Sequence, residues 1–288
     1  MPISTTPRVC VSTWALHSLL GRTFAGRPGD SGAFMIGSVP GTLDLLDVPV
    51  HLAKRGIFAM ELCHFHLPPD PAYRAAFAAA VRTAGVELWS VLIDDGDITH
   101  PDHGERDTAF VRGWLDVAGD LEARCVRVIA GKQPPTPETL GLARERLRGL
   151  ALDGYLRGVR VMTENWFDLL AAPDAVNTLL ADLSGAVGLC FDFGNWDARS
   201  DKYDALRQIA RYAESSHAKC RFDATGAMDE TDWRHCLDIL ARAGYAGPFT
   251  LVASDPADIW GGIERQSDFL RDNRYVLDAP TGDQKEAV

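Results

Sequence analysis

Short runs of apolar and β-branched residues alternate with longer amphipathic stretches from one end of the chain to the other. Such alternation is typical of repeated βα units around a mostly parallel sheet. The starts of successive runs lie about 28 to 49 residues apart, the length that a strand, a helix and two loops occupy. The runs predict eight strands, at residues 8–14, 57–63, 86–93, 125–130, 159–164, 187–191, 215–220 and 248–253.

The junctions between helices and strands share a signal. A glycine ends the helix directly before the strand in AKRGIFAMEL, RTAGVELWSVLI, YLRGVRVMTE and ARAGYAGPFTLV. Glycine at this place adopts the left-handed conformation that lets the chain turn back into a strand. Two helices also have clear starts, with Asp70 before Pro71 and Thr136 before Pro137.

Eight βα units predict an α/β fold, a single (β/α)8 TIM barrel over residues 1–278, with a polar tail at 279–288. The barrel is favoured over an open doubly wound sheet because the strand count matches and no glycine-rich phosphate loop follows the first strand. The connection at residues 16–42, with its six glycines, is longer than an ordinary βα loop. It predicts a lid over the ligand site, with a poorly ordered insertion as the alternative.

Composition narrows the class of partner. The chain has 29 basic and 40 acidic residues, a net charge of −11, which disfavours nucleic acid and anionic lipid. No apolar run is long enough for a membrane span, and the polar start lacks a signal peptide, so we expect a cytoplasmic protein. The six cysteines are scattered without a CxxC pair, which indicates buried thiols.

Three polar residues stand at equivalent ends of consecutive predicted strands. Glu164, Asp192 and His217 end the fifth, sixth and seventh strands, so they should meet at one rim of the barrel mouth. Two carboxylates and an imidazole suit one divalent ion, Mn²⁺, Mg²⁺, Co²⁺ or Zn²⁺. Taken singly, each could also be an ordinary polar group at a strand end.

The phrases GIFAMELCHFHLP, TEN, FDFGN, HAK and GYAGPFTL resemble the xylose-isomerase-like TIM barrels, which include sugar phosphate isomerases and epimerases and relatives of endonuclease IV. The likeness covers nearly the whole chain. It implies that a glutamate, an aspartate, a histidine and a final glutamate from strands five to eight bind one metal. Glu164, Asp192 and His217 would fill the first three positions. The resemblance also implies a homo-oligomer.

Two positions depart from the family pattern. Val252 stands where the last glutamate is expected, and valine can neither bind a cation nor carry a proton. Water, Asp255 or a histidine from across the mouth could replace it, or the metal is bound weakly. Asn195 stands where many relatives carry a histidine, which removes chemistry that a trinuclear zinc nuclease needs.

Other polar residues near strand ends are candidates for catalysis or binding. On the second strand, alternation puts His64 and His66 on one face, and we expect His66 to transfer protons and His64 to bind substrate. Lys219 and Arg221 should share the face of His217. Lys219 is a candidate for neutralising an oxyanion, and Arg221 for binding substrate.

For these polar groups a structural role is the competing interpretation. Loop carbonyls could hold the two histidines, and ion pairs inside the barrel could hold the cations. Arg127 is ambiguous in the same way, as a substrate ligand or a structural cation. Glu61 should be buried in mid-strand and paired with Arg127 or Lys219 rather than catalytic.

Aromatic and amide side chains complete the predicted site. Trp14 and Trp196 are candidates for contact with the apolar C–H faces of a polyol, although packing would explain them equally well. Asn165, next to Glu164, is a further substrate-binding candidate. The acidic loop at residues 94–103 could bind a cation or substrate hydroxyls, but it is interpreted in the first place as a solvated turn and helix cap.

These features predict a divalent-metal-dependent isomerase or epimerase that acts on a sugar or another small polyhydroxy carbonyl compound through an enediolate. Glu164 and His66 are the predicted proton-transfer groups. Because Val252 removes the usual second glutamate, a metal-dependent lyase or dehydratase with the same first step is an alternative. A barrel that only binds sugar is another.

Overall fold

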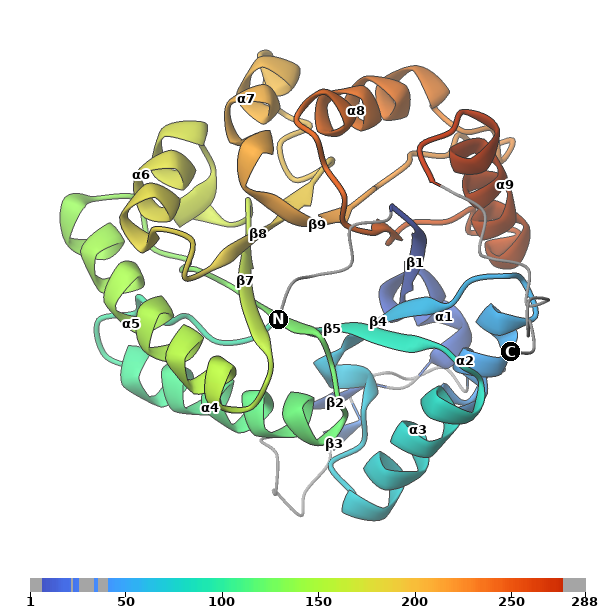
Figure 1. Cartoon of the computed structure of the whole chain (residues 1–288), viewed down its shortest axis with the longest axis horizontal. Coiled ribbons are helices and arrows are strands. Elements are labelled where there is room, and N and C mark those ends of the chain that lie inside the picture. Colours follow the sequence, from blue (N-terminus) through green and yellow to red (C-terminus); the bar gives the residue numbers. More distant parts are fainter. Residues whose placement is uncertain (1–6, 22, 26–33, 36–40, 277–288) are drawn as a thin grey trace, which may run out of the picture.

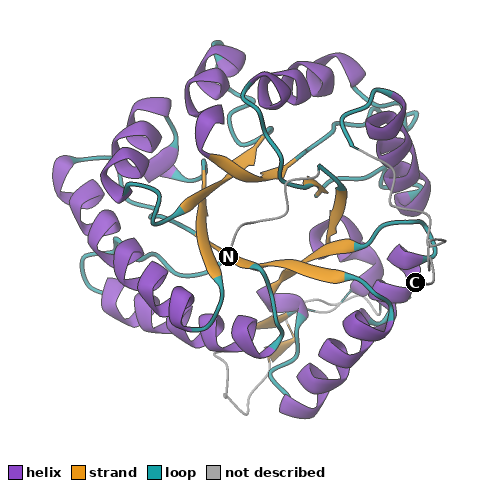
Figure 2. Ribbon diagram, in the orientation of Figure 1, coloured by secondary structure: helices purple, strands orange, loops and turns teal. Residues whose placement is uncertain are grey.

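The computed structural model describes residues 7–21, 23–25, 34–35 and 41–276. In this part of the chain eight parallel strands close into a barrel, in the order β1-β10-β9-β8-β7-β6-β5-β4, and helices surround it (Figures 1 and 2). The prediction of a (β/α)8 barrel is therefore confirmed. The barrel strands are β1 (Val9–Ser12), β4 (Ala59–Cys63), β5 (Glu87–Ile93), β6 (Cys125–Val128), β7 (Arg160–Glu164), β8 (Gly188–Asp192), β9 (Ala213–His217) and β10 (Phe249–Leu251).

The helices follow the strands as expected for βα units. A short pair of antiparallel strands, β2 (Phe24–Ala25) and β3 (Phe34–Met35), lies in the long first connection. The α-helices are α1 (His17–Leu20), α2 (Val48–Ala53), α3 (Pro71–Thr83), α4 (Gly104–Asp120), α5 (Pro137–Leu156), α6 (Pro173–Leu183), α7 (Lys202–Ile209), α8 (Glu230–Arg242) and α9 (Ile259–Asp272).

Local sequence signals account for the helix ends. Asp70 accepts a hydrogen bond from the backbone N–H of Ala72, and Thr136 forms a capping box with Thr139. The glycines of the four predicted helix-to-strand junctions have φ between 66° and 74°, in the left-handed region, at Gly56, Gly85, Gly158 and Gly244. These junctions are confirmed.

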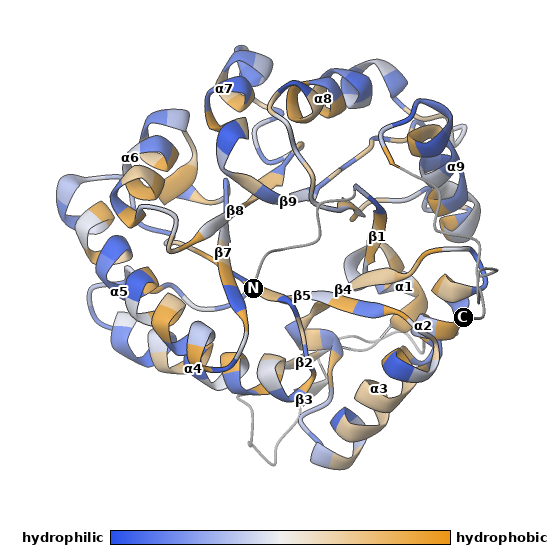
Figure 3. Cartoon of the chain, in the orientation of Figure 1, coloured by the Kyte–Doolittle hydropathy of each residue, from blue (hydrophilic) through white to orange (hydrophobic). Residues whose placement is uncertain are grey.

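Two layers of apolar side chains hold the barrel together. Inside it, Cys10, Ala59, Trp89, Cys125 and Met162 form a separate buried cluster. Outside it, the strands and helices bury a larger core that includes Phe77, Leu147, Leu180 and Leu240. Along the outer helices, hydrophilic and hydrophobic residues alternate in patches, as amphipathic helices require (Figure 3).

Two strand ends differ from the prediction, and both differences affect the site. β4 ends at Cys63, so His64–His66 form a 3-10 turn in which the alternation of a strand no longer applies. β9 ends at His217, so Lys219 and Arg221 lie in the following loop. Lys219 nevertheless lies with His217 beside Asp192, whereas Arg221 is exposed and pairs with Asp229, so the expected common face is wrong for Arg221 only.

The remaining predictions concern the cysteines, membrane-spanning helices, the first connection and the C-terminal tail. The six cysteines are buried and free, as predicted. In the described residues, no helix is long and apolar enough to cross a membrane. Much of the expected lid at 16–42 and all of the tail at 279–288 lie outside the described residues.

Candidate active site

Glu164, Asp192 and His217 come together at the carboxyl ends of β7, β8 and β9, as the strand phasing predicts. Nδ1 of His217 lies 3.4 Å from Oε1 of Glu164 and 3.5 Å from Oδ2 of Asp192. All three side chains are almost fully buried. The register places Asp192 directly beside His217 on the neighbouring strand.

Local hydrogen bonds fix the carboxylate of Asp192. Its Oδ1 accepts from the backbone N–H groups of Gly194 and Asn195, both at 2.7 Å. Asn165, which directly follows β7, binds the backbone of Asp192 through its side chain. Oδ1 of Asn165 accepts from the N–H of Asp192 at 2.8 Å, and Nδ2 of Asn165 donates to the carbonyl of Asp192 at 3.1 Å. Asn165 thus positions Asp192, and both polar groups of the Asn165 side chain are occupied by these hydrogen bonds.

Two cations flank the carboxylates, the buried Arg127 and the partly exposed Lys219. Nζ of Lys219 lies 2.9 Å from Oδ2 of Asp192, and Nε of Arg127 lies 2.9 Å from Oε2 of Glu164. Arg127 also forms a short ion pair with Asp94. Burial lowers the pKa of Lys219, but Asp192 and Glu164 outweigh burial and leave the pKa raised, so the ammonium stays charged. Burial raises the pKa of Asp192, and Lys219 and His217 bring it well below its usual value.

Asn195 links two of these groups. Its Nδ2 donates to Oε1 of Glu164 at 2.6 Å, and its Oδ1 accepts from Nζ of Lys219 at 2.8 Å. The amide therefore sets the spacing between a carboxylate and an ammonium at the mouth. The sequence identified Asn195 only as a departure from the family, because a bridging role depends on both partners in space.

Glu61 contacts His217 from the opposite side of the barrel. Its Oε2 is 3.1 Å from Nε2 of His217, and its side chain is fully buried. The expected ion pair of Glu61 with Arg127 or Lys219 is wrong, because those cations are held by Asp94, Glu164 and Asp192 near the rim. Burial lowers the pKa of His217, but nearby Cys190, Glu164 and Glu61 outweigh it and raise the pKa well above its usual value.

A cavity of about 330 Å³ opens beside these groups. This is within the size range of pockets for small ligands, which is roughly 300–1,000 Å³. Trp14 is 49% exposed, the largest exposed apolar side chain on its rim. The lining residues combine apolar walls with the polar cluster: Ser12, Trp14, Cys63, Phe65, Leu92, Asp94, Arg127, Glu164, Trp166, His217, Lys219 and Val252.

The two histidines that follow β4 do not line the mouth cavity. His66 is buried, with Nδ1 2.9 Å from the Thr13 hydroxyl oxygen and Nε2 2.9 Å from Nδ1 of His17. Burial, with a contribution from His17, lowers the pKa of His66 to about 3, so its imidazole is neutral. His64 packs edge-on against Phe110 and Trp114 of α4. Neither lines the mouth cavity.

Two further substrate-binding candidates also have other partners. Trp196 is buried, and its indole N–H donates to the carbonyl of Leu170 at 3.2 Å. Arg221 is 54% exposed and pairs with Asp229 at 2.8 Å. Direct substrate contact by His64, His66, Asn165, Trp196 or Arg221 stays a prediction, whereas Trp14, Arg127, Glu164 and Lys219 line the cavity.

The donor set fits a divalent metal ion. Two ligand atoms about 2.1 Å from one ion stand roughly 3.0–3.4 Å apart, close to the spacing of His217 Nδ1 from the two carboxylates. Oε2 of Glu164 and Oδ2 of Asp192 are buried and, apart from their ion pairs, accept no hydrogen bond from the described residues. With Glu61 and Asp94 there are four carboxylates, and they exceed the combined charge of Arg127, Lys219 and the protonated His217 by one.

Cys190 is a further potential ligand. Its thiol lies in one cluster with Glu164 and His217, the three donor atoms being within 4.8 Å of one another. Burial raises the pKa of Cys190 to about 11, so the thiol is protonated at neutral pH and is a poor ligand in that form. Asp192 is not part of this cluster, but its carboxylate is ionised and lies 3.5 Å from Nδ1 of His217, so it has the better chemistry for a third ligand.

No carboxylate replaces the missing fourth ligand among the described residues. Val252 is buried and forms part of the cavity wall. Asp255, the nearest acidic residue downstream, pairs instead with Arg265 at 2.7 Å. Water or substrate oxygens would have to complete the shell of a bound ion.

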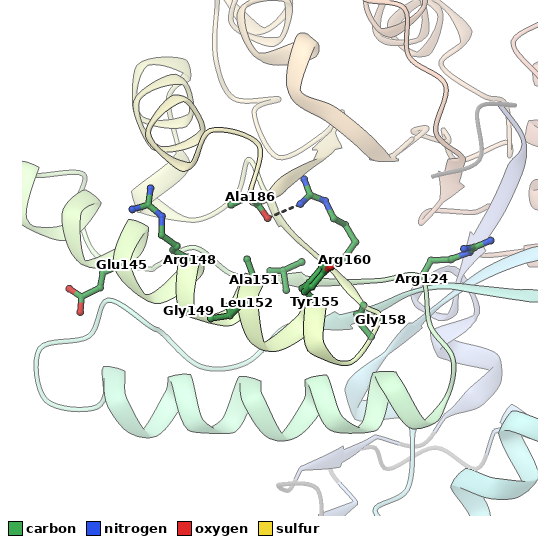
Figure 4. A pocket seen from close by; sticks show the side chains of 12 residues that line it. Arg124, Glu145, Arg148, Gly149, Ala151, Leu152, Tyr155, Gly158, Arg160 and Ala186 are labelled. Carbon is green, nitrogen blue, oxygen red and sulfur yellow. Dashed lines mark hydrogen bonds between the residues drawn. The ribbon is translucent and has the colours of Figure 1, made fainter. Parts of the chain in front are cut away.

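A larger cavity, about 1,000 Å³, lies at the other end of the barrel. It is formed by α5 and by residues at the starts of β6, β7 and β8, including Arg124, Arg160 and Ala186 (Figure 4). Reacting groups in TIM barrels come from the carboxyl ends of the strands, so this cavity does not belong to the site.

Sequence reasoning missed several residues of the site. Asp94 directly follows β5 and pairs with Arg127, although its loop was interpreted as a solvated turn. Its place at a strand end was the same signal that identified Glu164. Cys63 also lines the cavity, and nothing in the sequence distinguished it from a packing residue.

Comparison with known proteins agrees with this architecture. Residues 50–273 match the family model described as xylose isomerase-like TIM barrel, so the chain belongs to that family. None of the curated protein sequences matches the chain significantly.

Among solved structures, an L-ribulose 3-epimerase has a TM-score of 0.68 at 17% identity, covering 96% of this chain and 99% of its own. A D-psicose 3-epimerase determined in the presence of D-fructose has a TM-score of 0.65 at 17% identity, covering 83% and 95%. A xylose isomerase-like TIM barrel protein from Mycobacterium smegmatis in complex with magnesium has a TM-score of 0.63 at 18% identity, covering 94% and 97%.

Proposed function

We propose that the protein is a divalent-metal-dependent isomerase or epimerase of a sugar or another small polyhydroxy carbonyl compound. The observation that carries this proposal is the convergence of Glu164, Asp192 and His217 beside a cavity of small-ligand size. Structural neighbours that include D-psicose and L-ribulose 3-epimerases support the same class of reaction.

Glu164, Asp192 and His217 would hold the ion. When bound, a divalent ion supplies Lewis-acid stabilisation of negative charge on neighbouring substrate oxygens. The metal would be Mn²⁺, Mg²⁺, Co²⁺ or Zn²⁺, and the magnesium complex of one neighbour supports a divalent ion without selecting among these.

The chain's own groups supply proton transfer and charge stabilisation. Glu164 lines the cavity and removes a proton next to the substrate carbonyl, which yields an enediolate. Lys219 is charged and lies beside Asp192 and Asn195, so its ammonium stabilises the oxyanion that develops. His66 has no contact with the cavity, and a part in proton transfer would have to pass through Thr13 or His17.

The cavity favours an unphosphorylated substrate. The two cations that line it, Arg127 and Lys219, already have carboxylate partners among the described residues. Neither is free to bind a phosphate dianion without giving up an ion pair. The aromatic ring of Trp14 offers a flat apolar surface for the C–H face of a free sugar.

A lyase or dehydratase is the second candidate, and Val252 favours it. An epimerase needs a second group to return the proton on the other face, and Val252 cannot do this. An elimination needs one base and a leaving group. Glu164 alone would serve as that base.

Two further properties, the location and the assembly of the protein, are proposed. Six buried free thiols suit a reducing compartment, which supports a cytoplasmic location. Leu152 and Tyr155 (Figure 4) and the neighbouring Leu156 are more than 60% exposed on the last turns of α5. This exposed apolar face supports a homo-oligomer with α5 in the interface.

The reaction can be tested with free ketoses in deuterated water. The metal-loaded protein is incubated with D-fructose, D-psicose, D-tagatose and L-ribulose, with Glu164→Gln as the control. We expect an epimer or isomer that carries deuterium, formed by the wild type and not by the variant. Loss of water from the substrate would identify the lyase. Sugar binding without deuterium exchange would identify a barrel that only binds.

A further inference from the structure

Glu61 reaches His217 from across the barrel. It lies on β4, and its carboxylate is 0% exposed. Oε2 is 3.1 Å from Nε2 of His217, whereas Oε1 accepts no hydrogen bond from the described residues. A buried carboxylate with one unpartnered oxygen costs free energy, so it is not explained by stability alone.

The hydrogen bond determines which nitrogen of His217 carries a proton. A carboxylate oxygen accepts hydrogen bonds, so at 3.1 Å from Oε2 of Glu61 the Nε2 of His217 is the donor. A neutral His217 then has its lone pair on Nδ1. That atom faces Glu164 Oε1 at 3.4 Å and Asp192 Oδ2 at 3.5 Å.

We infer that Glu61 is a positioning residue, which holds His217 in the orientation and tautomer that direct the Nδ1 lone pair toward Glu164 and Asp192. The inference rests on the proposed metal centre, since only a ligand role gives this tautomer a function. Carboxylates that orient metal-binding histidines also raise their basicity, and losing such a partner typically weakens metal binding about 10–100-fold.

The alternative is that Glu61 only maintains the fold of the barrel. A structural role predicts a lower melting temperature in any variant and an unchanged affinity for metal in the protein that remains folded. Asp232 offers a matched control, because it is a buried carboxylate whose hydrogen-bond partners, Lys202 and Tyr203, belong to α7. Its longer ion pair, with Arg221 at 3.7 Å, also lies outside the mouth cavity.

The test measures Mn²⁺ affinity by titration calorimetry for the wild type, Glu61→Gln, Glu61→Met and Asp232→Leu. We expect Glu61→Met to raise the Kd about 10–100-fold. Glu61→Gln should raise it less, because an amide oxygen still accepts from Nε2. Asp232→Leu should lower the melting temperature of the metal-free protein and leave the Kd unchanged.

A second readout does not depend on affinity. In the Zn²⁺-loaded wild type with ¹⁵N-labelled histidine, Nε2 of His217 should carry an exchangeable proton, and Glu61→Met should lose the protection of that proton. Equal Kd values for the wild type and Glu61→Met would overturn the inference. Failure of the wild type itself to bind Mn²⁺ or Zn²⁺ would instead overturn the proposed metal centre, and this inference with it.

Discussion

Nδ1 of His217 lies 3.4 Å from Oε1 of Glu164, across the intervening strand β8. Two unlike donors at this spacing, both almost fully buried, form the centre of the proposed site. The carboxylate of Glu164 also accepts a hydrogen bond from the amide of Asn195 and forms an ion pair with the guanidinium of Arg127. Glu164 therefore combines the geometry of a ligand with that of a base at the edge of the cavity.

Replacing Glu164 by glutamine should abolish most of the activity. The amide keeps the size of the side chain but can neither accept a substrate proton nor provide a negative charge. We expect kcat to fall at least about 10²-fold, the usual contribution of general acid–base catalysis. Steady-state kinetics on the best ketose would measure this, and a variant with wild-type kcat would exclude Glu164 as the base.

Replacing Lys219 by methionine should affect turnover more than binding. Its ammonium contacts Asp192 and the Asn195 bridge and lines the cavity. Because it would stabilise charge that develops during the reaction, we expect kcat to fall about 10²–10³-fold with KM changed little. A rise in KM at constant kcat would show instead that Lys219 only binds the ground state.

A carboxylate introduced at position 252 should strengthen metal binding. Val252 is part of the cavity wall, where the family pattern places a glutamate. In Val252→Glu a fourth ligand becomes available, and we expect the Kd for Mn²⁺ to fall at least about 10-fold, because each added carboxylate raises affinity for a hard cation. Val252→Gln is the control of similar size, and the same Kd in both variants would argue against an ion at this place.

Trp14 and Trp196 should behave differently when replaced. Trp14 is half exposed on the cavity rim, so Trp14→Ala should raise KM about 5–10-fold and leave the melting temperature nearly unchanged. Trp196 is buried and bonded to Leu170, so Trp196→Ala should lower the melting temperature by several degrees. If both variants were stable and showed a similar increase in KM, Trp196 would be a substrate ligand like Trp14.

The buried His66 should make the fold less stable in acid. Its pKa is about 3 in the folded protein and near 6.5 in the unfolded chain, so the unfolded state binds more protons between these values. The stability that neutral His66 contributes is complete above pH 6.5 and is lost as the pH falls toward 3. From pH 7 to 4.5 we expect a loss of about 2–3 kcal/mol from this group.

Urea unfolding at several pH values would measure this dependence. The variant His66→Gln should lose less stability than the wild type over the same range, whatever its stability at pH 7. The exposed His235 provides the control, and His235→Gln should follow the wild type. Parallel curves for all three proteins would contradict a neutral, buried His66.

The sequence predicted which strand ends contribute residues to this site better than it predicted the contacts among those residues. Glu164, Asp192 and His217 could be identified because parallel strands in a barrel end at one rim, so strand phasing alone places them together. The histidines after β4 were misplaced because a 3-10 turn interrupts the strand after Cys63, and no residue there signals the change. Lys219 and Arg221 were predicted to share one face for a similar reason: β9 ends at His217, so the alternation of a strand does not extend to them.

Contacts across the barrel lie beyond what one sequence can reveal. Glu61 and His217 are 156 positions apart, and their strands are not neighbours in the sheet. The periodicity of β4 indicates that Glu61 is buried, but its partner depends on the tilt of the strands and on which cations the rim carboxylates already bind. The Asn195 bridge between Glu164 and Lys219 has the same origin.

Metal titration of the dialysed protein tests the central claim most directly. Calorimetry with Mn²⁺, alongside the single variants Glu164→Gln, Asp192→Asn and His217→Gln, measures whether these three side chains hold one ion. We predict one site per chain in the wild type and at least tenfold weaker binding in each variant. An unchanged affinity in all three variants, or no binding by the wild type to any of Mn²⁺, Mg²⁺, Co²⁺ and Zn²⁺, would contradict the account.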